Sequence, residues 1–221
     1  MSASSGQDIV EDGLVICVDA GDSKSYNGSG TTWTDRVGST NGTIDGATFS
    51  SDYGGLFDFD GTNDSVNFGN ASHINFIYTD AFSLEAWVNP DSLSGFTHII
   101  GKSYGNYRLA VISTGYTLRL DSNQLTTNAG SPTVGEWQHV VATWEPSTST
   151  AKVYVNGVLE ETKTDTNVNW TNETMNFQIG NSQSESYYFN GKIPIGRVYN
   201  KTLTLAEVKQ NFKATRSRFG V

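Results

Sequence analysis

Apolar and polar side chains alternate with a period of two along most of the chain between Leu14 and Tyr199. This is the pattern of strands that bury one face and leave the other polar. In segment 82–88 (FSLEAWV), Phe82 and every second residue after it are apolar, and segments 117–121 and 152–156 repeat the alternation. Clusters of Gly, Asn, Asp and Ser separate such segments, as turn residues do. The sequence therefore predicts many short strands.

Two local signals predict how particular elements begin and end. Asn156-Gly157 between two alternating segments predicts a two-residue hairpin, because a type I′ turn requires positive φ at both positions. Near the carboxyl end, Thr204 to Glu207 forms a capping box, flanked by Leu203 and Val208 as a hydrophobic staple. Leu205, Val208 and Phe212 recur at helical spacing, so one short helix should pack an apolar stripe on the strands.

These elements predict an all-β fold: a two-sheet antiparallel sandwich with one short C-terminal helix. The chain has 221 residues, which is enough to form a hydrophobic core that needs no disulfide bond or metal ion to stabilise it. No linker or repeat divides it, so we predict one domain over residues 14–221 after a flexible N-terminal segment, 1–13. Cys17 is the only cysteine and lies in an apolar strand, which predicts a buried thiol and excludes an intrachain disulfide.

Charge and hydropathy exclude two classes of partner. The formal net charge is −9, whereas binding to a phosphate backbone requires a basic surface. We therefore expect no nucleic acid partner. The first thirteen residues lack the basic and apolar regions of a signal peptide, and no later stretch approaches a membrane span. We expect neither a leader nor a membrane span.

Five motifs occur in a characteristic order. They are FDFDGTNDSV at 57–66, FSLEAWV at 82–88, GEWQHVVATW at 135–144, VYVNG at 153–157 and GRVYNKTLT at 196–204. Together they resemble laminin-G-like modules of the concanavalin A-like lectin/glucanase superfamily. The resemblance implies a jelly roll, in which the concave sheet and the loops at one rim are free to hold a ligand.

The two ends of the chain carry a narrower resemblance. Segments 14–26, 30–35 and 211–221 resemble modules common in structural proteins of tailed phages. This implies a virion decoration, fibre or adhesion component that binds a cell-surface polysaccharide. Other virion proteins and further copies of this chain would be its protein partners. The expected location is the virion, or otherwise a soluble or extracellular setting.

Aromatic side chains are the candidate glycan contacts, because sugar rings stack on them while amides bind the hydroxyls. The tyrosine-rich loop 181–190 is the best candidate, and Tyr104 with Tyr107 a second. Trp87 is a third, although it also fits beneath the terminal helix, and the loop also fits a contact with a neighbouring virion subunit. The predicted ligand-binding residues are Trp87, Tyr104, Tyr107, Tyr187, Tyr188 and Phe189.

Four oxygen-bearing side chains lie close together at Asp58, Asp60, Asn63 and Asp64. Oxygen ligands are what Ca²⁺ prefers, so the segment is a candidate calcium site, and calcium is the only cofactor that we expect. The alternative is an Asx-type turn that needs no metal. Segment 192–196 (KIPIG) lacks the acid that related modules often carry there, which weakens the calcium interpretation.

The motifs of enzymes with this architecture are missing. No Glu is followed by Asp two residues later, as the Glu-x-Asp-x-x-Glu strand of laminarinase-type hydrolases requires. The arginine-rich and Gln-x-His strands of polysaccharide lyases are also missing. We therefore predict a non-catalytic carbohydrate-binding or adhesion module. A purely structural virion protein and a glycanase are the alternatives.

Overall fold

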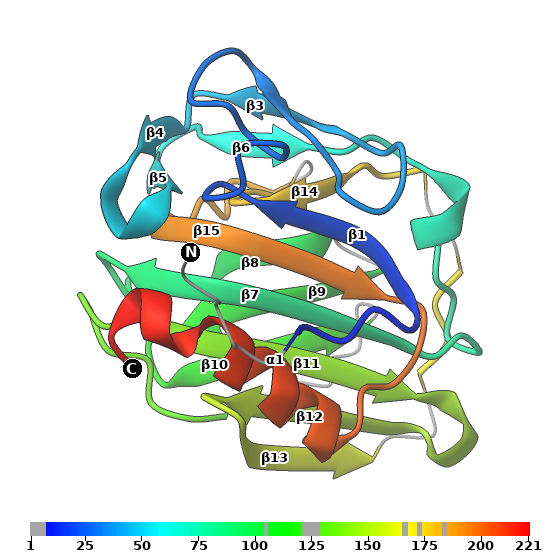
Figure 1. Cartoon of the computed structure of the whole chain (residues 1–221). Helices are drawn as coiled ribbons and strands as arrows, with labels where there is room; N and C mark the ends of the chain where they lie inside the picture. The colour runs from blue at the N-terminus through cyan, green and yellow to red at the C-terminus, as the bar shows by residue number, and fades with distance from the viewer. Residues whose placement is uncertain (1–7, 104–105, 121–128, 165–167, 172–173, 183–184) are drawn as a thin grey trace.

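Two antiparallel sheets lie face to face in the computed structural model of the chain, with one helix on the outside (Figure 1). The structure describes residues 8–103, 106–120, 129–164, 168–171, 174–182 and 185–221. Alternating side chains from both sheets meet between them and form one apolar core. The predicted all-β jelly-roll sandwich with a C-terminal helix is confirmed.

The eight-stranded sheet runs in the order β13-β12-β11-β7-β15-β5-β4, and β1 also pairs with β15. Its strands are β1 (Leu14–Asp19), β4 (Thr48–Ser50), β5 (Leu56–Asp60), β7 (Phe82–Pro90), β11 (Gln138–Glu145), β12 (Thr150–Val155), β13 (Val158–Thr164) and β15 (Asn190–Tyr199).

The seven-stranded sheet runs in the order β10-β9-β8-β14-β6-β3-β2. Its strands are β2 (Thr32–Trp33), β3 (Gly42–Asp45), β6 (Ser65–Asn67), β8 (Thr97–Lys102), β9 (Tyr107–Ile112), β10 (Gly115–Leu120) and β14 (Phe177–Ile179). Three short 3₁₀ helices lie in the connections, at Asp52–Gly54, Ser72–Ile74 and Pro146–Thr148.

Strand β7 is buried on both faces. Phe82 and Leu84 face the core, as the alternation predicts. Glu85 and Trp87 on the opposite face are equally inaccessible to solvent. The cause is helix α1 (Leu205–Phe219), which lies across the outer face of the eight-stranded sheet in front of β7, β11 and β12 (Figure 1).

Helix α1 begins as predicted. The Thr204 hydroxyl accepts a hydrogen bond from the Glu207 backbone N–H, and the Glu207 carboxylate accepts one from the Thr204 N–H. Leu203 and Val208 share one apolar cluster beneath the helix, which confirms the staple. Leu205 does not join the buried stripe and is 40% exposed. It lies in the first turn and lines a surface groove with Leu159 of β13.

The predicted hairpin is present between β12 and β13. Val155 pairs with Val158, so the loop contains two residues. Asn156 and Gly157 have φ values of 51° and 77°, the left-handed conformation that a type I′ turn needs at both positions.

The chain before β1 is packed for a longer stretch than the sequence predicts. Val10 is buried, its N–H donates to the Asn211 side chain at 2.8 Å, and its carbonyl accepts from the Tyr199 hydroxyl. Within the predicted segment 1–13, Asp8 also contacts α1, because its carbonyl accepts a hydrogen bond from the Gln210 side chain. Cys17 is a buried free thiol, as predicted, and burial raises its pKa. No helix in the described residues is long and apolar enough to cross a membrane.

Candidate functional site

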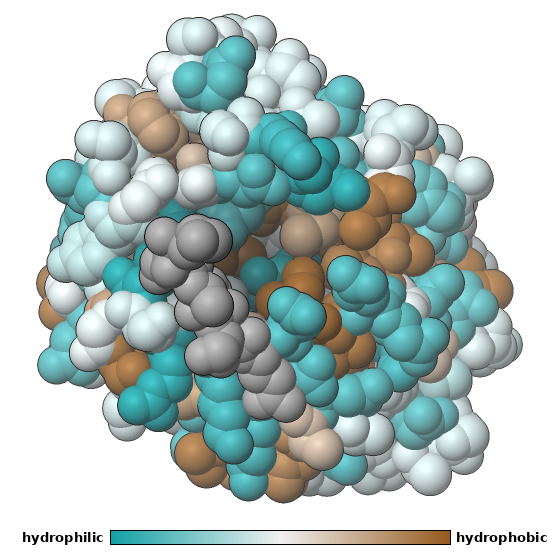
Figure 2. Space-filling view, viewed as in Figure 1, coloured by the Kyte–Doolittle hydropathy of each residue, from teal (hydrophilic) through white to brown (hydrophobic). Residues whose placement is uncertain are grey.

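The two outer faces of the sandwich differ in what covers them. Helix α1 covers the outer face of the eight-stranded sheet. Figure 2 shows this side of the molecule. Hydrophilic and neutral side chains cover most of this surface, and the apolar patches are small. The seven-stranded sheet has no such helix among the described residues. Thr32, Thr43 and Arg119 on its outer face are exposed or partly exposed, so this part of the face has room for a ligand.

A polar network closes the space between α1 and the eight-stranded sheet. The Glu85 carboxylate accepts from Arg197, from His139 at 3.1 Å and from Asn211 at 2.6 Å. Burial alone would raise the pKa of Glu85, but the Arg197 charge and these hydrogen bonds outweigh it and hold the pKa at about 2. All four side chains are buried, so the network joins helix to sheet and offers no route for a ligand.

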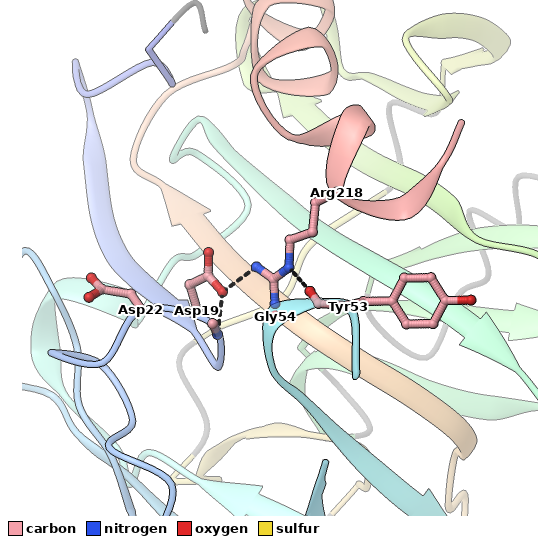
Figure 3. Close-up of a pocket in the computed structure, with 6 residues that line it drawn as sticks. Asp19, Asp22, Tyr53, Gly54 and Arg218 are labelled. Atoms are coloured by element: carbon pink, nitrogen blue, oxygen red, sulfur yellow. Dashed lines mark hydrogen bonds and ion pairs between the residues drawn. The ribbon is translucent and has the colours of Figure 1, made fainter. Parts of the chain in front are cut away.

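The charged residues that line a hollow at the carboxyl end of α1 form ion pairs and hydrogen bonds within the protein (Figure 3). Arg218 forms an ion pair with Asp19 at 2.6 Å and donates to the Tyr53 carbonyl. Asp22, at the rim, pairs with Arg36 at 2.8 Å. Because the charged groups already have partners, this hollow anchors the end of α1 and is not our candidate site.

Strand register lines up a row of mainly polar residues across the outer face of the seven-stranded sheet. Directly paired residues share a face, and the core-facing neighbours, such as Leu109 and Leu118, point the other way. The row reads Arg119, Arg108, Gly101, Gln178, Asn67, Thr43, Thr32. Thr117, Ala110 and His98 form a second row beside it.

An aromatic and charged group lies at the arginine end of this row, and we call it the Phe96 cluster. Its members are Phe96, Arg108, Arg119, Glu185 and Tyr187. The Arg119 and Arg108 guanidinium carbons lie 4.3 and 4.8 Å from the centre of the Phe96 ring. The Tyr187 ring meets Phe96 edge to face at 4.8 Å. Both rings are half-buried, so each keeps an accessible edge or face.

The two arginines differ in their partners. Arg108 is buried and forms an ion pair with Glu185, and its guanidinium also donates to the Ser182 hydroxyl at 3.3 Å. Arg119 is only partly buried, and no carboxylate of the described residues lies within 4.0 Å of it. Its positive charge is therefore available to a ligand.

Several buried polar atoms of this face have no hydrogen-bond partner among the described residues. They are His98 Nδ1, Thr117 Oγ1, Arg119 Nε and Gln178 Oε1. The His98 Nε2 atom must carry the proton, because it faces the Gln178 carbonyl at 3.1 Å. Burial lowers the pKa of His98 to about 3, so the ring is neutral and Nδ1 is an acceptor. Folded proteins pair nearly all such groups, and because His98 and Thr117 are fully buried, a water molecule rather than a glycan is small enough to complete their hydrogen bonds.

The structure removes three of the predicted ligand-binding residues from the surface. Trp87 is buried under α1, where it packs on Phe219. Tyr107 faces the core because it shares the alternation of Leu109 and Val111. Phe189 packs edge to face on Phe59 in the core.

The other three predicted aromatic residues have different outcomes. Tyr187 joins the Phe96 cluster. Tyr188 is half-buried and has no ring contact among the described aromatic pairs. Tyr104 lies outside the described residues.

Two of the four predicted calcium ligands, Asp60 and Asp64, already accept backbone hydrogen bonds within a turn. Asp60 accepts from the Thr62 N–H at 2.7 Å, and Asp64 accepts from the Asp60 N–H at 2.8 Å. Asp58 lies on β5 opposite Lys192, and Asn63 is exposed beside the turn. Within the part of the chain that the structure describes, no three His, Cys, Asp or Glu side chains are arranged to hold a metal ion. These hydrogen bonds match the Asx-turn alternative, and calcium stays a prediction without structural support.

Sequence reasoning missed Phe96, Arg108 and Arg119 as candidate site residues. The alternation around Leu118 places Arg119 on the polar face, which was a usable signal. No sequence pattern near Phe96, which follows Gly95 in a loop, predicts that it belongs to a site. The pairing of β9 with β10 and the approach of Tyr187 bring these side chains together, and both are contacts between distant segments.

The two antiparallel sheets packed face to face define a lectin-like β-sandwich domain. A family model described as the concanavalin A-like lectin/glucanases superfamily matches residues 60–209. The chain belongs to this superfamily. No curated protein sequence matches the chain.

Similar solved structures share the fold at low identity. Sialidase from Trypanosoma rangeli matches with a TM-score of 0.69 and 20% identity, over 98% of this chain and 36% of that chain. Domain 4 of AbnA, an extracellular arabinanase from Geobacillus stearothermophilus solved with arabinotriose, matches with a TM-score of 0.70 and 18% identity, over 92% of this chain and 100% of that one.

The binding domain of Paraclostridial Mosquitocidal Protein 1 matches with a TM-score of 0.71 and 14% identity, over 90% of this chain and 52% of that chain. The chain thus spans about a third of the length of the sialidase. At these identities the likeness concerns the fold alone.

Proposed function

We propose that this chain is a non-catalytic carbohydrate-binding module whose ligand binds at the Phe96 cluster. The observation that carries the proposal is the placement of two half-buried rings, Phe96 and Tyr187, beside the partly exposed Arg119 guanidinium. A sugar presents an apolar face that stacks on such rings and hydroxyls that accept hydrogen bonds from a guanidinium. The arabinotriose bound to domain 4 of the arabinanase is consistent with this use of the fold.

Two features of the carboxylates favour binding over hydrolysis. A glycosidase commonly needs two carboxyl groups on opposite sides of the scissile bond. Glu185 is the carboxylate of the Phe96 cluster, and it is engaged by Arg108. Glu85 is buried beneath α1 on the other side of the sandwich. Release of reducing ends from a polysaccharide by the purified protein would contradict the non-catalytic assignment.

A role in attachment on a phage particle is part of the proposal, and it is supported by the resemblance of segments 14–26, 30–35 and 211–221. In that setting the ligand is a polysaccharide of the cell surface, and other virion proteins and copies of this chain are its protein partners. The competing role is a structural decoration protein that binds no sugar. Tyr187 would then be covered by a neighbouring subunit in the assembled particle.

A glycan array with three variants tests the proposal. We expect the wild type to bind a subset of glycans, and Phe96→Leu and Tyr187→Ala each to weaken that binding about tenfold, as loss of a stacking contact does. Tyr78→Ala is the matched control, because Tyr78 is 38% exposed and contacts Trp170 rather than the Phe96 cluster. Absence of binding to every glycan, or equal binding by all variants, would reject the proposed site.

A further inference from the structure

We infer that the ligand of the Phe96 cluster is anionic, a glycan with a carboxylate or sulfate group that binds Arg119. The inference rests on the proposed glycan-binding function and specifies the chemical class of the ligand. Carboxylate and sulfate share the chemistry that matters here, which is a pair of negatively charged oxygens matched to a guanidinium.

The first support is the position of Arg119 opposite another arginine. Arg119 of β10 and Arg108 of β9 are direct partners in the ladder, and both point to the outer face. Like charges at directly opposite positions destabilise a sheet. The chain has 23 acidic and only 14 basic residues, so an acid at this position would fit the general composition better. A bound anion would remove the repulsion.

The second support is that only one of these two charges is neutralised inside the protein. Glu185 pairs with Arg108, and carboxylates likewise pair with Arg36, Arg197 and Arg218. Among the described arginines, only Arg119 and Arg216 have no carboxylate within 4.0 Å. Arg216 is exposed on α1, where water solvates it. Arg119 is half-buried and has a buried Nε atom without a partner, so solvent compensates it less well.

The third support is the contact with the Phe96 ring. The Arg119 guanidinium carbon lies 4.3 Å from the ring centre, so the ring helps to hold the guanidinium in place, and its Nη atoms are left to donate hydrogen bonds to an anionic group. Thr117 lies two residues before Arg119 on the same strand face, but its side chain is fully buried, so Arg119 alone offers its charge to the anionic group.

The test compares matched glycan pairs that differ only in charge. Trigalacturonate and its methyl ester form the carboxylate pair, and a sulfated galactan oligosaccharide and its desulfated form provide the sulfate pair. Affinity is measured by isothermal titration calorimetry in EDTA, so that calcium cannot bridge the ligand to acidic side chains. We expect at least one anionic oligosaccharide to bind about tenfold more tightly than its neutral counterpart. The pair that shows this preference identifies the anionic group.

Three variants assign the preference to one side chain. Arg119→Gln should remove it, and Arg119→Lys should retain part of it, because the charge remains but the planar fork is lost. Arg216→Gln is the matched control, since Arg216 also lies over an aromatic ring, Phe212 at 5.4 Å, on the opposite side of the sandwich. Before the binding measurements, thermal denaturation must show that all three variants unfold at the same temperature as the wild type.

The possible outcomes separate this inference from the proposed function. Equal affinity for the charged and neutral members of both pairs overturns the inference. If this charge-independent binding is lost in Phe96→Leu, the proposed glycan-binding function is still supported. A preference that survives in Arg119→Gln overturns the inference too. Absence of binding to any glycan, neutral or charged, rejects the proposed function and the inference together.

Discussion

The side-chain amide of Asn211 in α1 donates a 2.6 Å hydrogen bond to the Glu85 carboxylate of β7. This bond connects residues 126 positions apart and attaches the helix to a fully buried charge. Arg197 neutralises that charge from the neighbouring strand. The outer face of the eight-stranded sheet is thereby closed by a specific polar network as well as by apolar packing.

Replacing Glu85 should destabilise the fold strongly. In Glu85→Gln the Arg197 guanidinium keeps its buried charge without a counterion, which costs about 3–5 kcal/mol. Urea denaturation measures the loss. Glu160→Gln is the control, because Glu160 is exposed on β13 and should change the free energy of unfolding by less than about 0.5 kcal/mol. Equal effects of the two substitutions would show that the network contributes no specific stability.

His98 should make stability depend on pH in mildly acidic solution. Its pKa is about 3 in the folded protein and 6.5 in the reference state, so between these values the unfolded chain binds a proton that the folded chain does not. Its contribution to stability is full above pH 6.5 and falls by about 1.4 kcal/mol per pH unit as the pH decreases towards 3.

Denaturation of His98→Gln at several pH values isolates this contribution. Glutamine keeps an N–H donor for the Gln178 carbonyl but does not titrate, so the slope below pH 6.5 should become shallower. His73→Gln is the control, because His73 is exposed. An unchanged slope in His98→Gln would assign the acid sensitivity to other groups.

The capping box should contribute measurably to the attachment of α1. Thr204→Ala removes the acceptor for the Glu207 N–H and should lower stability by about 1 kcal/mol. Thr204→Ser retains a hydroxyl at the same position and should recover most of that loss. Thermal unfolding followed by circular dichroism compares the two, and a serine variant as unstable as the alanine variant would argue against the cap.

Calcium should leave the stability of the protein unchanged. The Asp60 and Asp64 carboxylates already accept backbone N–H groups, so the turn is satisfied without a cation. Melting temperatures in EDTA and in millimolar calcium are therefore expected to coincide. A calcium-dependent increase that disappears in Asp60→Asn would establish the metal site instead, because a ligand of the folded state raises the melting temperature by mass action.

Part of the candidate site was accessible to sequence reasoning. Tyr187 was predicted as a ligand-binding residue, and the structure places it in the Phe96 cluster. Tyr107 could have been excluded, since it shares the period of Leu109 and Val111. The alternation in β7 predicted an exposed polar side, but Ser83, Glu85 and Trp87 on that side are all buried, and Trp87 packs under a helix that begins more than a hundred residues later.

What the sequence alone determined is local. Three features depend only on residues a few positions apart: the faces of β7, the turn at Asn156-Gly157 and the start of α1 at Thr204. Periodicity and turn chemistry were therefore sufficient to predict them. The tertiary structure decided which polar faces are covered and which arginines meet. Burial of Trp87 and the pairing of Arg119 with Arg108 depend on strand register and packing between distant segments, and a short stretch of sequence carries no information about either.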